Sequence, residues 1–149
     1  MLVPQKTRYA LRALFELAKR YGQGPAKIAE IARVQAIPGR FLEVIFPELK
    51  RGGFVDSKRG REGGYFLIRE PIRISVGEVM RFLHGSLRPV ECTDSNSKKA
   101  CPLRESCVFL AMWRRAEQAA AEVYDGTTFQ DLVNEETEVH ARRAPSYNI

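Results

Sequence analysis

Histidine, cysteine and tryptophan are scarce in this 149-residue chain, which has two, three and one of them respectively. The sequence lacks a catalytic histidine constellation, a dinucleotide-binding fingerprint and a Cys-x-x-Cys pair, so nothing in it favours an oxidoreductase or any other enzyme. It also lacks an apolar run near the roughly 20 residues of a membrane span, and its first residues lack the apolar core of a signal peptide. We therefore expect a cytoplasmic protein that is neither an enzyme nor a membrane protein.

Basic charge is concentrated in the first half of the chain. The composition, 44% apolar and 28% charged, is typical of one ordinary globular domain. Residues 1–70 hold 14 Lys or Arg against 7 Asp or Glu, whereas residues 71–149 hold 10 against 11. This asymmetry favours a polyanion as the partner of the N-terminal half, with nucleic acid ahead of an acidic membrane surface. Solvated charge on a stable domain is the alternative.

Residues 1–85 have the element order of a winged helix-turn-helix. Apolar side chains recur at helical spacing in four stretches, and two short stretches rich in β-favouring residues stand between the third and the fourth. The predicted helices cover about 7–21, 25–36, 40–51 and 75–85, and the predicted hairpin strands cover 54–58 and 65–69. Three helices followed by a hairpin indicate a DNA-binding domain whose hairpin is the wing.

The third helix and the hairpin tip carry the candidate DNA-binding residues. Arg40 and Glu43 occupy the first turn of that helix, where Arg can donate two bonds to guanine and Glu can accept one from cytosine. Phe41 is suited to a thymine methyl group. Arg59 and Arg61 lie at a glycine-rich tip that allows close approach to phosphate. The alternative is that Arg40 and Glu43 form a solvated ion pair and that the two tip arginines keep an edge hairpin soluble.

A long helix with an apolar seam dominates the C-terminal part. From residue 102 to Gly126, apolar residues alternate at three and four positions, and so small a domain has too little core to cover them, so a second copy of the chain should. The predicted dimer contacts are Phe109, Trp113, Ala116, Ala120 and Val123. We assign 108–133 to this dimerisation helix and a short last helix opened by Thr127 and Gln130, and 134–149 to a mobile tail. The fold class is mainly α with a small β wing.

All three cysteines, Cys92, Cys101 and Cys107, lie within sixteen residues of the predicted loop 86–107. An odd number of thiols in a reducing compartment argues against disulfides and favours metal or redox chemistry. Their spacing is unlike the paired cysteines of structural zinc, but thiolates on a loop can wrap an iron–sulfur cluster that orders it. The fourth ligand must then be a nitrogen, an oxygen or an external molecule. Zinc held by the cysteines and one other residue, or a clusterless dithiol, are the alternatives.

Several segments of the sequence match a known family together with these cysteines. They are Thr7–Leu14, Ile28–Ala32, Phe41–Glu43, Gly53–Tyr65 with its Arg-Gly-x-x-Gly-Gly-Tyr wing, and Ser75–Val79. Over about residues 1–133 the chain resembles bacterial winged-helix regulators of the IscR and NsrR type. The resemblance implies a homodimer that is paired through the long helix, binds an imperfect palindrome in double-stranded DNA and carries an iron–sulfur cluster in each subunit.

The resemblance also implies roles for particular positions. Arg40, Phe41, Glu43 and Val44 would face bases, and Arg59 would enter the minor groove. The cluster would be held by Cys92, Cys101 and Cys107, and we favour 2Fe-2S over 4Fe-4S.

Two features depart from the family's pattern. Pro47 removes the helical bond to the Glu43 carbonyl and should kink or shorten the third helix. Leu110 stands where some relatives have a histidine ligand, and the region of Thr7 has no acidic residue that would match the ligand of others. The other fourth-ligand candidates are His84, Glu91, Asp94 and Glu105.

The sequence therefore predicts a DNA-binding transcription regulator, a repressor, whose cluster senses redox state, nitric oxide or iron supply. The alternative is a zinc-stabilised or clusterless winged-helix protein that acts through thiol redox chemistry or through an acidic protein partner. Salt dependence separates DNA from a protein partner, because phosphate contacts make affinity fall steeply with salt.

Overall fold

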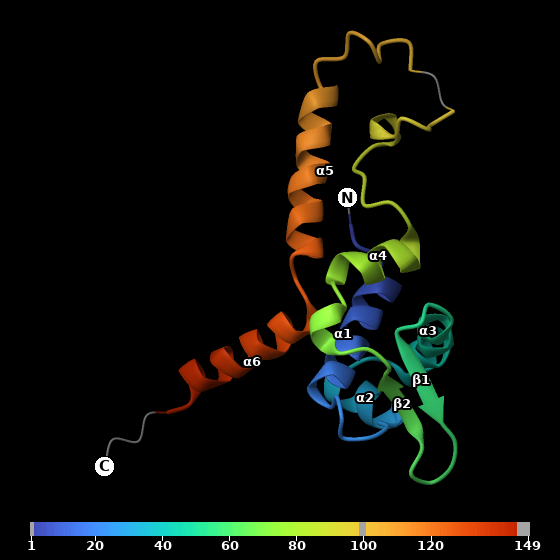
Figure 1. Cartoon of the computed structure of the whole chain (residues 1–149), viewed down its shortest axis with the longest axis vertical. Helices are drawn as coiled ribbons and strands as arrows, with labels where there is room; N and C mark the ends of the chain where they lie inside the picture. Colours follow the sequence, from blue (N-terminus) through green and yellow to red (C-terminus); the bar gives the residue numbers. More distant parts are fainter. Residues whose placement is uncertain (1, 99–100, 146–149) are drawn as a thin grey trace.

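The computed structural model describes residues 2–98 and 101–145, and within them six α-helices accompany a two-stranded antiparallel hairpin (Figure 1). The helices are α1 (Gln5–Lys19), α2 (Ile28–Gln35), α3 (Gly39–Arg51), α4 (Val76–His84), α5 (Leu110–Asp125) and α6 (Phe129–Arg143). The strands are β1 (Val55–Lys58) and β2 (Gly64–Leu67), and two short 3-10 turns are η1 (Pro71–Arg73) and η2 (Glu91–Thr93). The predicted fold class is confirmed, because this is a mainly helical winged helix-turn-helix with a small β wing.

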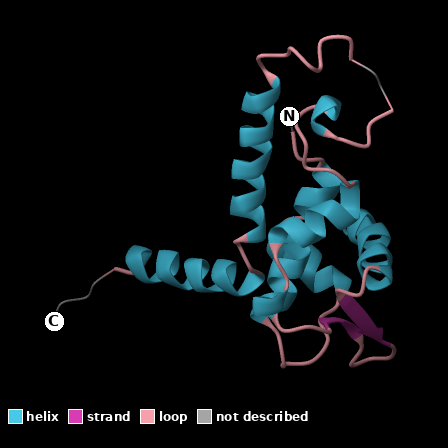
Figure 2. Ribbon diagram, turned by 45° about the horizontal axis from the view of Figure 1, so that its top comes forward, coloured by secondary structure: helices cyan, strands magenta, loops and turns pink. Residues whose placement is uncertain are grey.

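The hydrophobic core lies between α1, α2, α3, the base of the wing and α4. Its fully buried side chains include Leu14, Ile31, Phe46, Phe54 and Val79. Phe129, the first residue of α6, is also fully buried, so the end of the chain closes the same core. The remainder of α6 runs outward (Figures 1 and 2).

Helix α5 stands away from this core. Figures 1 and 2 show it meeting the winged-helix domain at its C-terminal end, beside α4, while its other end is reached by the cysteine-containing segment. None of its sixteen residues is buried. The isolated chain therefore gives α5 almost no core of its own.

The long helix begins at Leu110, two residues after the predicted start at 108. Two other predicted features are corrected by the structure. The last helix is not short, and it extends into the predicted mobile tail as far as Arg143. Thr128 and Asp131 form its capping box, one residue beyond the predicted pair Thr127 and Gln130, while the Thr127 hydroxyl donates to the Val123 carbonyl. Reciprocal capping supports a helix start without any core contact. Residues 146–149 of the predicted tail lie outside the described residues.

Pro47 does not shorten α3. The helix runs through it from Gly39 to Arg51. Glu43 and Pro47 are both exposed, so the carbonyl that loses its bond can be hydrated while the buried face of the helix stays packed. Of the predicted kink or shortening of the recognition helix, the shortening is wrong, and the kink stays a prediction.

None of the helices within the described residues is both long and apolar enough to cross a membrane.

Candidate nucleic-acid interface and cysteine segment

The outer face of α3 presents three of the four side chains that were predicted to face bases. Arg40, Glu43 and Val44 are exposed, and Val44, an apolar residue, is 65% exposed. Phe41 is half-buried instead, because its ring packs edge-on against Tyr9 with 5.2 Å between ring centroids. The Arg40 guanidinium lies over the Phe41 ring at 5.2 Å. The geometry therefore suits Phe41 to support Arg40.

The wing tip holds Arg59 and Arg61 in solvent. Gly60 has a φ of +105°, a conformation that side chains disfavour, and its carbonyl accepts a bond of 3.0 Å from the Gly63 amide. A Cβ atom on Gly63 would overlap the backbone of Lys58. The glycines therefore make a tight turn that leaves both arginines free to reach a DNA backbone.

The wing and α3 are fixed to each other. Tyr65 of β2 stacks on Phe46 of α3 with 4.5 Å between ring centroids. Tyr65 also exchanges backbone hydrogen bonds of 2.9 and 2.8 Å with Ala26, just ahead of α2. At the far end of α3, Lys50 contacts Asp56 at 3.2 Å. The Ser57 amide, and after it Lys50, lowers the pKa of Asp56 below its usual range.

Sequence reasoning missed several basic side chains of this half. Within the part of the chain that the structure describes, no carboxylate pairs with the basic residues on α2, on the outer face of α3 or at the wing tip. Arg40 and Glu43 do not pair with each other, so the alternative of a solvated ion pair is wrong. The basic side chains of residues 2–70 without a carboxylate partner are Arg8, Arg12, Lys27, Arg33, Arg40, Arg51, Lys58, Arg59 and Arg61. Such uncompensated charge is what a phosphate backbone attracts.

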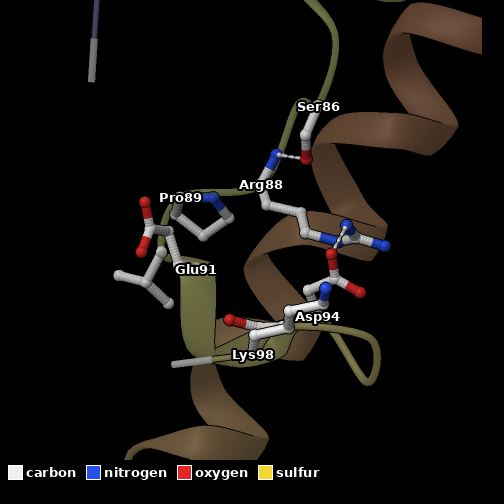
Figure 3. Close-up of a pocket in the computed structure, with 8 residues that line it drawn as sticks. Ser86, Arg88, Pro89, Glu91, Asp94 and Lys98 are labelled. Carbon is white, nitrogen blue, oxygen red and sulfur yellow. Dashed lines mark hydrogen bonds and ion pairs between the residues drawn. The ribbon is translucent and has the colours of Figure 1, made fainter. Parts of the chain in front are cut away.

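The cysteine segment is tied to α5 by one arginine. The Arg88 guanidinium contacts Asp94 at 3.0 Å and Glu117 of α5 at 3.1 Å. Arg104 donates to the Asp94 carbonyl at 3.0 Å. Figure 3 shows Arg88 and Asp94 at a cavity of about 570 Å³ whose lining also includes Ser86 and Lys98. The segment is thus held by ion pairs and hydrogen bonds more than by buried apolar contacts.

The three cysteines are free thiols that are not gathered at one point. Cys92 in η2 and Cys107 are half-buried, and Cys101 is exposed. Among the described residues, no group of three His, Cys, Asp or Glu side chains is arranged to hold a metal. Residues 99 and 100 of the predicted cluster loop lie outside the described ranges. Three thiolates suit iron or zinc chemically, but the segment as it stands does not present them as a formed site.

His84 and Asp94 are fourth-ligand candidates that contact other groups of the protein. The Nδ1 atom of His84 lies 3.3 Å from the hydroxyl of Thr7, which is fully buried. Asp94 pairs with Arg88. The structure does not bring either of them together with the three cysteines as a formed site.

The predicted dimer seam is an exposed apolar stripe along α5. Phe109 is 58% exposed and Val123 is 65% exposed. Trp113 and Ala120 are half-buried, and Ala116 is exposed. At its C-terminal end α5 is clamped to α4 by the two bonds of Arg81 to Asp125, of 2.5 and 2.7 Å. Dimer formation stays a prediction.

A helix-turn-helix with an exposed basic face and a glycine-tipped wing defines the class of winged-helix DNA-binding regulators. Within this class the chain belongs to the Rrf2 family, described as iron-dependent transcriptional regulators, whose profile matches residues 3–135. The predicted family resemblance is confirmed.

Individual relatives agree with this assignment. The chain is 35% identical over 134 residues to the HTH-type transcriptional regulator CymR of Bacillus subtilis, with 90% of this chain and 91% of that protein covered. The solved structure of CymR, the global cysteine regulator of B. subtilis, matches with a TM-score of 0.75 and 34% identity over 91% of this chain and 98% of that one. The structure of T. potens IscR matches with a TM-score of 0.76 and 31% identity over 99% and 95%. These relatives are transcriptional regulators and not enzymes, as was expected for this chain.

Proposed function

We propose that this DNA-binding regulator is a cytoplasmic homodimer and a repressor whose cysteine segment holds an iron–sulfur cluster that senses redox state, nitric oxide or iron supply. One observation carries the proposal. The only three cysteines of the chain all lie in the segment that joins the winged-helix domain to α5. A change at these thiols therefore acts between the DNA-binding domain and the helix with the exposed apolar seam.

The DNA-binding half supplies the operator contacts. We infer that Arg40, Glu43 and Val44 read bases in the major groove and that Arg59 enters the minor groove, with Arg61 on the backbone. The exposure of these side chains and the lack of internal carboxylate partners among their arginines support this assignment. Two such domains related by a two-fold axis match an imperfect palindrome.

Dimerisation follows from the energetics of α5. A sixteen-residue helix with no buried residue is marginal in water, because packing supplies most helical stability. A second copy of α5 would cover Phe109, Trp113, Ala116, Ala120 and Val123. The Arg81–Asp125 clamp would then fix the angle between this seam and the wing of each subunit.

In this proposal Cys92, Cys101 and Cys107 hold the cluster, and we keep 2Fe-2S ahead of 4Fe-4S. When bound, the cluster supplies iron that is open to oxidants, because its fourth ligand is not a cysteine. The protein's own contribution is mechanical. A rearranged segment breaks or remakes the contacts of Arg88 with Asp94 and Glu117, and α5 moves with them. Operator affinity changes if the two arrangements bind DNA with different free energies.

A clusterless thiol switch is the second candidate, and two observations favour it. The described cysteines are separate, with Cys101 exposed, and the chain resembles CymR, the global cysteine regulator of B. subtilis. Zinc in place of a cluster is a further outcome that the experiment below distinguishes, and the salt dependence of binding distinguishes an acidic protein partner from DNA.

The deciding experiment is a visible absorption spectrum of protein purified without oxygen, with iron, sulfide and zinc quantified. We expect visible absorption with iron and sulfide in equal amounts, lost when any one cysteine is replaced by Ala. Ser106→Ala, at the exposed neighbour of Cys107, is the matched control and should keep the colour. Stoichiometric zinc without iron or sulfide would indicate that the cysteines hold a structural zinc ion instead of a cluster. Protein without metal, whose DNA affinity responds to thiol oxidation, would support the clusterless switch.

A further inference from the structure

Helix α2 packs on the core through Ile31, its single fully buried residue, and through the partly buried Ile28 and Ala32. Fully burying one such side chain contributes about 1.5 to 3 kcal/mol. Polar contacts at both ends of α2 add to this apolar packing.

A buried carboxylate of α1 supplies these contacts. Glu16 is 3% exposed, and its Oε2 atom accepts a hydrogen bond of 2.8 Å from the side-chain amide of Gln35, the last residue of α2. Its other oxygen contacts Arg20 at 2.9 Å, and Arg20 reaches Glu30 near the start of α2 at 2.7 Å. Both ends of α2 are thus clamped onto α1 by one polar network.

The clamp acts next to the most constrained point of the helix-turn-helix. Ala36 follows Gln35 with a φ of 50°, and among the described residues it is the single non-glycine residue with a positive φ. That conformation disfavours an alanine by about 1 to 2 kcal/mol, so surrounding contacts must hold it. Ile37, which comes next, is buried, and α3 begins two residues later.

The same carboxylate is connected to α6. Lys19 lies 3.0 Å from Glu16 and 3.3 Å from Glu136 of α6. Helix α6 follows α5 in the chain, and its start is anchored in the core by Phe129, whose amide donates to the Ile74 carbonyl at 3.0 Å. A continuous chain of polar contacts thus joins α6 to the turn before α3.

We infer that Glu16 is a positioning residue for operator recognition. It fixes α2 and the turn that presents α3, and through Lys19 it makes this position depend on α6. The inference rests on α3 being the DNA-reading helix. It predicts that loosening the clamp lowers affinity for a specific operator while the affinity for random duplex, which depends on charge, is kept.

The test uses an operator selected from a random duplex pool by the wild-type protein. Gln35→Met keeps the shape and removes the amide that binds Glu16. We expect about a tenfold loss of operator affinity, since a hydrogen bond to a charged group is lost, with affinity for random duplex unchanged within about twofold. Glu136→Gln should give a smaller loss of the same kind. The matched control is Glu138→Gln, at an exposed position two residues beyond Glu136 on α6, and it should give no loss of operator affinity.

Each outcome decides the inference. Equal losses of affinity for operator and for random duplex, or no loss of operator affinity, would overturn the role of Glu16. Equal operator affinities of Glu136→Gln and Glu138→Gln would overturn the link to α6. If Gln35→Met does not fold, Gln35→Asn, one methylene too short to reach Glu16, takes its place. Arg40→Ala is measured in parallel. If it leaves operator affinity unchanged, the DNA-reading face itself is wrong; if it alone weakens operator binding, that face stands and the clamp falls.

Discussion

Replacing Gly64 by Ala should detach the wing from Ala26, in the segment that leads into α2. Gly64 has a φ of +149°, and an added Cβ atom would overlap the carbonyl group of Ala26, which is backbone and cannot move aside like a flexible side chain. A non-glycine residue in such a conformation costs on the order of 1 to 3 kcal/mol. Relieving the overlap also breaks the two hydrogen bonds between Ala26 and Tyr65, each worth about 1 kcal/mol net.

Gly60→Ala is the matched comparison. Gly60 also has a positive φ, of +105°, but a Cβ atom there meets nothing within 4 Å, so only the backbone strain applies. We expect Gly64→Ala to be about 2 kcal/mol more destabilising than Gly60→Ala, a difference of roughly 4 to 8 °C in melting temperature for a chain of this length. For each variant, urea unfolding followed by circular dichroism measures the free energy of unfolding, and thermal unfolding measures the melting temperature. Equal shifts in the two variants would refute the role given to the Ala26 contact.

Three further predictions follow from the interface, the seam and the buried carboxylate. Arg59→Ala should weaken operator binding by about 1 to 3 kcal/mol in an anisotropy titration, whereas Arg33→Ala should weaken all duplexes alike and lower the salt slope by about one; unchanged affinity would remove each residue from the interface. Trp113→Glu should yield a monomer in sedimentation at micromolar concentration, and an intact dimer would place the interface elsewhere. Burial opposes the ionisation of Glu16, but hydrogen bonds from its neighbours outweigh burial and lower its pKa below the usual value. Its ionised form therefore stabilises the fold above the ordinary pKa of Glu, and the advantage over Glu16→Gln should vanish as pH falls through the lowered pKa; a pH-independent difference would contradict this.

The helix-turn-helix was predictable because its signals are local. The apolar spacing of α3 matches its buried face of Leu42, Ile45, Phe46 and Leu49, and Ser75 caps α4 as its spacing with Glu78 predicts. The capping box of α6 was placed one residue early, because the sequence offers two adjacent threonines and only the fold decides which one caps. The length of α6 was missed because its outer part has no core pattern.

The Glu16 clamp was not predictable from local sequence. Glu16, Lys19 and Arg20 are spaced like a solvated set of charges on one helix face, and such pairs contribute little. Their burial comes from α2 and α6, through Gln35 and Glu136, which are distant along the chain. The cysteines were easy to find from their clustering, but their arrangement was not, because no apolar packing specifies the loop.

Helices α2 and α5 share a property that suits a regulator. One fully buries a single residue and the other buries none, and ion pairs and hydrogen bonds add to the contacts that join both to the domain. A helix held by a large apolar face cannot change position without losing several kcal/mol of burial, whereas the hydrogen bond of Gln35 to the buried Glu16 contributes about 1.5 to 3 kcal/mol and the partly exposed ion pairs of α5 contribute less. Allosteric coupling energies fall in the same range. In the proposed mechanism, a chemical change at the cysteines therefore acts through these polar contacts while the core around Leu14 and Phe46 stays folded.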